Sequence, residues 1–150
     1  MTGFVTGFFT REGVLTCDGV ALTAVAAAFG TPTYVYSAQM LTERFQALDR
    51  AFADVPHRVH YAIKANSTLA IVRHLRAAGA AADANSGGEL ECALRAGFAP
   101  SEIGFTGVGK SRAELERAGA LGLAAINAES LGDVERIGAL VDIAGAQPEI

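Results

Sequence analysis

The chain alternates between strand-like runs and helix-like segments along most of its length. Strand-like runs are predicted at residues 33–36, 58–64, 80–84, 103–106 and 124–127. Each run is followed by a segment that has the pattern of a helix, and the connections between them are short. Strict strand–helix alternation is typical of a parallel sheet with right-handed crossovers. The sequence therefore predicts an α/β fold, and its periodicity alone leaves open whether the sheet belongs to a barrel or is open.

Serine residues mark where the predicted helices begin. Ser86 and Glu89, and then Ser111 and Glu114, have the spacing of a capping box, in which serine and glutamate satisfy each other's backbone N–H groups. Ser130 opens a third helix in the same way, and glycines stand where several of the helices should end. These signals fix the helix boundaries better than the apolar pattern alone.

The first thirty residues do not fit the strand–helix series. Residues 1–19 are strand-like and rich in turn residues, which predicts a hairpin around Gly13. Residues 20–29 are rich in alanine and predict a helix that ends at Gly30, before Pro32. We therefore expect a segment at residues 1–30 that is separate from the α/β part at residues 31–150.

Composition excludes several classes of protein. The chain has 150 residues, 51% of them apolar, and a net charge of −4, which suits one folded domain that binds neither nucleic acid nor a membrane. The apolar run at residues 20–30 is too short to span a bilayer, and no cationic leader precedes it, so we expect a cytoplasmic protein. Neither the two cysteines nor the three histidines have the spacing of metal ligands, so no metal site is predicted.

Lys64 closes the strand-like run 58–64 and shares one predicted strand face with His60 and Ala62. A lysine at the end of a buried strand can extend its ammonium to the rim, and that is the more common case. It can also serve as an amine nucleophile. Polar and glycine-rich stretches follow the other strands too, and sites of α/β proteins lie at the carboxyl ends of strands. This placement favours a functional role for Lys64.

Gly104–Ser111 satisfies the pattern of a phosphate-binding P-loop, so a nucleotide-binding protein is a second hypothesis. Its context is poor, because a P-loop should follow a buried apolar strand that ends just before the first glycine. Here Pro100 and Glu102 occupy that place, and the strand-like residues run through Gly104. Ser111, the last residue of this pattern, is already explained by its predicted role as a helix cap.

Several segments in register resemble the ornithine/diaminopimelate/arginine decarboxylase family. Tyr61–Asn66 resembles the region of the family to which pyridoxal phosphate attaches, and further similar segments lie at residues 30–36, 83–90, 96–98, 105–111 and 126–130. The resemblance covers residues 10–145. It implies an alanine-racemase-like (β/α)8 TIM barrel followed by a β-domain. Residues 1–30 would pair with that β-domain, and residues 31–150 would be the first part of the pyridoxal-phosphate-binding barrel, with about five of its eight units.

The resemblance also implies roles for individual residues. Lys64 matches the lysine that carries pyridoxal phosphate, and Asp83 matches an acidic residue close to that lysine and the cofactor. Glu89 matches a further acid near the site, although its predicted cap with Ser86 already explains both residues. His60 shares the predicted face of Lys64, and a hydrogen-bonded core histidine is the simpler interpretation.

The sequences at residues 86–90 and 109–111 resemble the branch of the family that decarboxylates meso-2,6-diaminopimelate to L-lysine and carbon dioxide. Decarboxylases of other basic amino acids or of carboxynorspermidine, and a non-catalytic regulatory relative, remain alternatives. The family's remaining cofactor ligands would lie beyond residue 150, and its full-length members form homodimers. We therefore expect the isolated chain to be inactive and prone to aggregate, because an open arc of strands leaves sheet edges uncovered.

Overall fold

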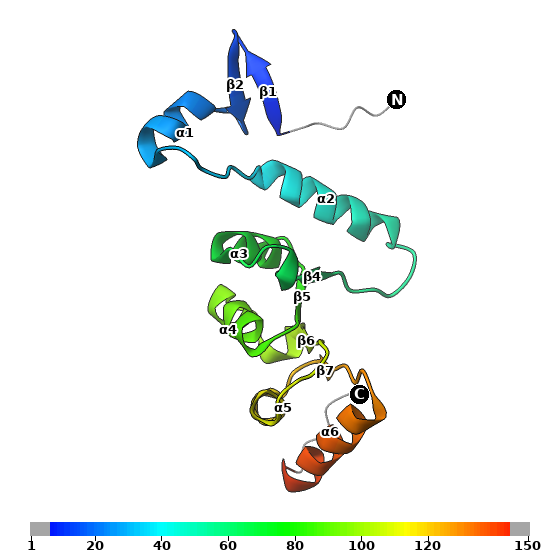
Figure 1. The fold of residues 1–150 in the computed structure, drawn as a ribbon. Coiled ribbons are helices and arrows are strands. Elements are labelled where there is room, and N and C mark those ends of the chain that lie inside the picture. Colours follow the sequence, from blue (N-terminus) through cyan, green and yellow to red (C-terminus); the bar gives the residue numbers. More distant parts are fainter. Residues whose placement is uncertain (1–6, 145–150) are drawn as a thin grey trace. The chain divides into compact units, whose positions relative to one another are not determined.

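The structure is a computed structural model that describes residues 7–144. It divides into two compact units, residues 1–55 and 56–150. The first unit holds β1 (Phe8–Arg11), β2 (Val14–Cys17), β3 (Val20–Ala21), α1 (Leu22–Phe29) and α2 (Ala38–Ala51). The second holds β4 (His60–Ala62), α3 (Leu69–Ala77), β5 (Ala81–Ala84), α4 (Gly87–Ala96), β6 (Ile103–Phe105), α5 (Arg112–Leu121), β7 (Ala125–Ile126) and α6 (Leu131–Ala144) (Figure 1).

The predicted hairpin around Gly13 is confirmed. Strands β1 and β2 pair antiparallel with Arg11 opposite Val14, which leaves Glu12 and Gly13 as a two-residue turn. Both turn residues have positive φ, 51° and 80°, as a type I′ hairpin turn requires. The helix predicted from residue 20 was wrong at its start, because residues 20–21 pair with β2 as a third strand and α1 begins only at Leu22.

The strand predicted at residues 33–36 was wrong. This segment forms no strand, and the side chains of Tyr34 and Tyr36 are 90% and 53% exposed. A strand forms only where a neighbouring strand pairs with it. The β-branched and aromatic residues at positions 33–36 favour an extended backbone but do not provide that neighbour. The helix that follows was predicted correctly. Ser37 caps α2 by accepting a hydrogen bond from the Met40 N–H, and its own hydroxyl donates to Asp18 at 2.5 Å.

The parallel sheet of the second unit is confirmed. Its strand order is β4-β5-β6-β7, and every neighbouring pair is parallel. Asp83 on β5 lies in register with Ala62 on β4 and with Gly104 on β6. The carboxyl ends of all the strands in this sheet therefore meet at one edge, where polar residues follow each of them.

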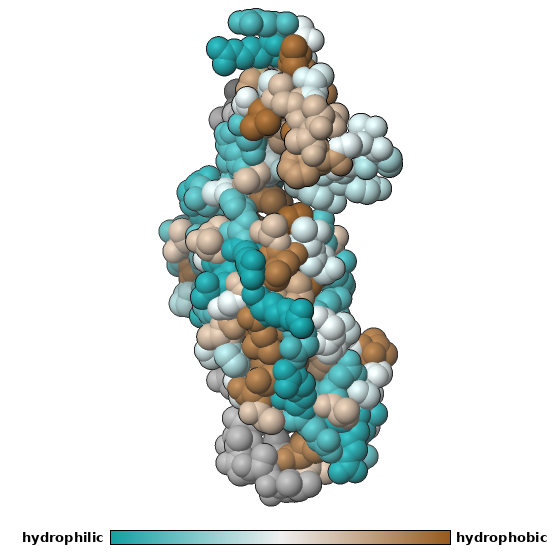
Figure 2. All heavy atoms as spheres, turned by 90° about the vertical axis from the view of Figure 1, so that its left-hand side faces the viewer, coloured by the Kyte–Doolittle hydropathy of each residue, from teal (hydrophilic) through white to brown (hydrophobic). Residues whose placement is uncertain are grey.

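The two faces of this sheet differ. Ala82, Ala84 and Phe105 are fully buried in the main core, together with apolar side chains of the helices. In Figure 1 the helices α3, α4 and α5 lie on one side of the strands, which makes that side the core. Figure 2 shows the molecule from that side, where hydrophilic and hydrophobic residues are mixed, as expected of amphipathic helices that present polar side chains to water. The opposite face of the sheet carries the polar side chains.

Candidate active site

Lys64 lies in a single 3₁₀ turn, Ile63–Ala65, that follows β4 directly. The strand itself is only His60–Ala62, so the prediction that Lys64 shares a strand face with His60 was wrong. Ile63 is fully buried and fixes the turn in the core, whereas Lys64 next to it is exposed. Asn66 then accepts a hydrogen bond from the Thr68 N–H, which delays the start of α3 to Leu69. The short turn thus anchors the backbone and leaves the amine free to reach the sheet edge.

A chain of side-chain hydrogen bonds runs along this edge from Lys64. The Lys64 ammonium donates to Asn85 Oδ1 at 3.2 Å, and Asn85 Nδ2 donates to Asp83 Oδ2 at 3.1 Å. The other oxygen of Asp83 accepts from the Thr106 hydroxyl at 2.6 Å, and Thr106 Oγ1 accepts from Asn127 Nδ2 at 2.8 Å. Each of the four strands contributes to this chain at its carboxyl end. A cation and an anion are therefore held near each other by fixed polar groups.

An open cavity of about 540 Å³ lies on the same face of the sheet. Its lining residues come from all four strands and the loops after them: His60, Asp83, Gly104, Thr106, Ala125 and Asn127. Gly104 and Ala125 leave room because their side chains are small, while the other lining residues present polar groups. A concave surface with a few convergent polar groups has the form of a small-molecule site.

His60 lines this cavity and is exposed, so the prediction of a core histidine was wrong in its burial. Its hydrogen bonding is satisfied on one side, because Nδ1 lies 3.1 Å from the Ala82 carbonyl oxygen. A carbonyl oxygen only accepts hydrogen bonds, so Nδ1 carries the proton in this contact.

Ser86 and Glu89 hold the backbone between β5 and α4 in place. Ser86 caps α4 by accepting a hydrogen bond from the Glu89 N–H, as predicted. The reciprocal bond of the predicted capping box is absent, because Glu89 Oε2 accepts from the Asn85 N–H at 2.9 Å instead. In a capping box the glutamate would bind the N–H of Ser86, three residues before it, whereas here it binds the N–H of Asn85, four residues before it. Its carboxylate therefore holds the backbone of Asn85.

Lys110 does not form a phosphate cradle. It is only 3% exposed, and its ammonium donates to the carbonyls of Gly107 at 2.7 Å and Asn127 at 2.6 Å. The buried carboxylate of Asp133 lies 3.7 Å away. The first glycine of the pattern, Gly104, lies inside β6, whereas a P-loop begins after its strand. Lys110 is therefore a structural lysine that joins the loops after β6 and β7.

Two carboxylates in these loops have a lowered pKa. Backbone and hydroxyl hydrogen bonds from Ser111, and then the Gly87 N–H, lower the pKa of Glu114. The Glu129 N–H, followed by the Arg136 guanidinium, lowers the pKa of Asp133. Each carboxylate therefore stabilises the folded state above its unfolded pKa, near 4, and this stabilisation is lost as the pH falls through the folded pKa.

Acid should consequently destabilise the protein below about pH 4, because both carboxylates bind protons more readily in the unfolded state than in the folded state. The measurement is the free energy of unfolding in urea as a function of pH. Asp133→Asn should make this dependence on pH shallower, because one of the two carboxylates is then missing. An unchanged slope in this variant would contradict the assignment.

Gly107 allows the loop after β6 to approach Asn85 closely. Its φ is +121°, and a Cβ placed there would lie 2.6 Å from the Asn85 carbonyl oxygen. Gly107→Ala should therefore cost about 1–3 kcal/mol of stability and displace the loop that carries Asn85. Gly109→Ala is the matched control, because its φ is +73° and nothing lies within 4 Å of its added Cβ. Equal unfolding midpoints for the two variants would show that the contact with Asn85 is not the cause of the stability loss in Gly107→Ala.

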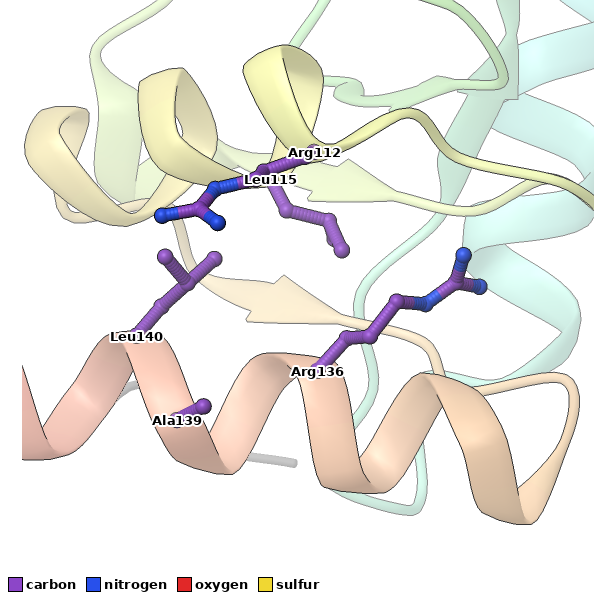
Figure 3. A pocket seen from close by; sticks show the side chains of 5 residues that line it. All are labelled: Arg112, Leu115, Arg136, Ala139 and Leu140. Atoms are coloured by element: carbon purple, nitrogen blue, oxygen red, sulfur yellow. The ribbon is translucent and has the colours of Figure 1, made fainter.

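A second cavity, of about 270 Å³, lies between α5 and α6 (Figure 3). Leu115 and Leu140 face one another across it, and Arg112 and Arg136 stand beside them. Arg112 pairs with Glu116, and Arg136 pairs with Asp133. No residue of the hydrogen-bond chain lines this groove, so it is separate from the candidate site.

Neither a cluster of metal-binding side chains nor a membrane-spanning helix occurs in the described part of the chain. Within residues 7–144 no group of three or more histidine, cysteine, aspartate or glutamate side chains is placed to hold a metal ion. Among the same residues, no helix is both long enough and apolar enough to span a bilayer.

The structure brings together part of the predicted site and adds three residues to it. Lys64 and Asp83 are connected through Asn85, and His60 lies beside Asp83 in the cavity. Asn85, Thr106 and Asn127 were not predicted as site residues. The available signal was their position, because each polar residue directly follows a strand of the sheet.

Comparisons with known proteins show the family to which the chain is similar. Residues 38–145 match the family described as "Pyridoxal-dependent decarboxylase, pyridoxal binding domain". The chain is 43% identical over 130 residues to a diaminopimelate decarboxylase of Pseudomonas aeruginosa, an alignment that covers 87% of this chain and 31% of the relative. The chain spans about a third of the length of the curated relatives it matches.

Solved structures show the same similarity. The diaminopimelate decarboxylase of M. jannaschii superposes with a TM-score of 0.84 at 28% identity, over 95% of this chain and 34% of that one. The Helicobacter pylori diaminopimelate decarboxylase complexed with L-lysine gives a TM-score of 0.81 at 33% identity, over 85% of this chain and 32% of that one. Both the matched residues and the shared fold confirm the family predicted from the sequence motifs, and the chain belongs to the pyridoxal-dependent decarboxylases.

Proposed function

We propose that this chain is the first part of a pyridoxal-phosphate-dependent carboxy-lyase that converts meso-2,6-diaminopimelate to L-lysine and carbon dioxide. The observation that carries the proposal is the Lys64 amine at the carboxyl end of the parallel sheet, hydrogen-bonded through Asn85 to Asp83 beside an open cavity. The named relatives support the substrate, because they are diaminopimelate decarboxylases and one of them was solved with L-lysine bound.

The residues at this edge fit pyridoxal phosphate by their chemistry. Lys64 offers an exposed primary amine, the group to which the cofactor's aldehyde attaches. Asp83 offers a carboxylate fixed by two side-chain donors, and His60 offers a ring nitrogen at the cavity. When bound, pyridoxal phosphate supplies the electron sink that stabilises the carbanion left by departing carbon dioxide.

The chain's own residues supply positioning and proton transfer. Lys64 would hold the cofactor through its amine, and the same amine, placed at the sheet edge, would be available for proton transfer to the substrate. Asp83 has a fixed orientation at the cavity wall, because Thr106 and Asn85 each donate to one of its oxygens. Ser86 and Glu89 act indirectly by holding the loop that carries Asn85.

The proposal extends to the whole protein. Residues 31–150 would form the first units of an eight-unit TIM barrel, and residues 1–30 would pair with a β-domain that follows the barrel. We further propose that the complete enzyme, meaning the full-length protein that contains this chain, acts as a cytoplasmic homodimer in lysine biosynthesis.

The test is a substrate panel on the purified complete enzyme loaded with pyridoxal phosphate. Carbon dioxide release and the amine product are measured with meso-2,6-diaminopimelate, ornithine, arginine and carboxynorspermidine. We expect L-lysine from diaminopimelate with kcat/KM on the order of 10⁴ M⁻¹s⁻¹ or higher, and at least about 100-fold lower values for the others. Faster turnover of another substrate would refute the assigned substrate, and the isolated 150-residue chain should show no turnover.

A further inference from the structure

Asn85 bridges the two charged groups of the site. Its Oδ1 accepts from the Lys64 ammonium at 3.2 Å, and its Nδ2 donates to Asp83 at 3.1 Å. We propose that Asn85 is the positioning residue for the Lys64 amine, holding it at the sheet edge before the cofactor attaches and after the substrate releases it. This inference rests on the proposed function, because it assumes that Lys64 is the attachment residue.

The charges on either side determine which way the Asn85 amide faces. An ammonium can only donate, so the amide oxygen must face Lys64, and a carboxylate can only accept, so the amide nitrogen must face Asp83. A carboxylate in place of the amide would stand beside Asp83 and repel it, and an apolar side chain would bind neither group. Asparagine is therefore matched to this place by both of its polar ends.

Asn85 is itself held from two directions. Its backbone N–H donates to Glu89 Oε2 at 2.9 Å, and its carbonyl packs where Gly107 has no side chain. The next link, Asp83, is fixed by Thr106, and Thr106 by Asn127. The amide thus has a defined orientation before any cofactor binds, which lowers the cost of placing the amine correctly.

The position of the amine matters for a defined covalent step. Once the Lys64 ammonium has released one proton to solvent, the lone pair of Nζ can attack the aldehyde carbon of pyridoxal phosphate. A C=N bond then forms as the C=O bond breaks, and the aldehyde oxygen leaves as water with the two protons that remained on the amine. A flexible exposed lysine spends most of its time away from the required geometry. An acceptor at a fixed point confines Nζ near the cavity edge and should raise the rate of attachment.

Three variants of the complete enzyme without cofactor test this proposal. Asn85→Leu removes both hydrogen bonds, Asn85→Asp keeps an acceptor but removes the donor, and Asn85→Gln keeps the amide on a longer side chain. Attachment of pyridoxal phosphate is followed by borohydride trapping and peptide mapping at timed intervals. We expect about 10-fold slower attachment at Lys64 in the first two variants and partial recovery with glutamine.

A second readout needs no cofactor. The rate of reductive methylation of Lys64 by formaldehyde is measured against an added small amine, and Lys64 is distinguished from Lys110, the other lysine of this chain, by mapping. We expect Asn85→Leu to change this rate about threefold or more while the unfolding midpoint stays that of the wild type. Arg112→Ala, which removes one partner of an exposed ion pair outside the hydrogen-bond chain, is the control and should leave both rates unchanged.

The outcomes separate the two proposals. Trapping on Lys64 in the wild type with unchanged rates in all three Asn85 variants would overturn the role of Asn85 and leave the attachment site standing. A fall in stability that accounts for the slower attachment, with no change in methylation and no recovery by glutamine, would also overturn it. Absence of trapping on Lys64 in the wild type would refute the proposed function itself.

Discussion

Replacing Lys64 with alanine in the complete enzyme is expected to lower the rate of decarboxylation by about 10³-fold or more. Under the proposed function, the variant would lose both the covalent attachment point and the amine that is available for proton transfer. Its fold should be unaffected, because the side chain is exposed and makes one hydrogen bond, to Asn85. The measurement is carbon dioxide release from diaminopimelate under saturating pyridoxal phosphate.

The control for this prediction is Arg112→Ala, which also removes an exposed cation but lies in a surface pair with Glu116. It should retain the full rate. If Lys64→Ala kept more than about a tenth of the wild-type activity, another residue would have to supply the amine, and the assigned site would be wrong.

Replacing Lys110 with methionine is expected to destabilise the protein by about 3 kcal/mol. Methionine fills a similar volume but donates no hydrogen bond, so the carbonyls of Gly107 and Asn127 lose a charged donor in a buried place. The carboxylate of Asp133 also loses a nearby cation and, among the described residues, keeps its ion pair with Arg136. Urea unfolding of the complete enzyme, with the m-value compared, measures the loss.

A matched comparison isolates the role of burial. Arg112→Met removes a cation whose side chain is 80% exposed, and no change in the unfolding midpoint is expected. Lys110→Met should also lower activity, because Asn127 at the end of the hydrogen-bond chain loses the contact that fixes its backbone. Equal unfolding midpoints for the two methionine variants would contradict the structural role assigned to Lys110.

The order of elements in the second unit was predictable from the sequence because local rules determine it. Ser111 and Glu114 form the predicted capping box, and each strand of the sheet follows the apolar pattern. The strand at residues 33–36 was wrong because local β-preference does not report whether a neighbouring strand is present. Lys64 was correctly placed at the edge of the sheet, but its 3₁₀ turn depends on how Ile63 packs in the core.

The candidate site was predictable only in part. Motifs named Lys64 and Asp83 as candidates. The link between them is Asn85, whose amide orientation depends on two groups that are distant in sequence from each other. Lys110 looked like a phosphate-binding residue in a short pattern. Its burial follows from the packing of the loops after β6 and β7, which no local pattern contains.

The central claim is that Lys64 carries the cofactor, and borohydride reduction of the complete enzyme followed by peptide mapping tests it most directly. Within this chain the result is easy to assign, because its two lysines are Lys64 and Lys110, and Lys110 is 3% exposed. We predict one phosphopyridoxyl group, on Lys64. A phosphopyridoxyl group on any other residue, or none at all in an active preparation, would contradict the claim.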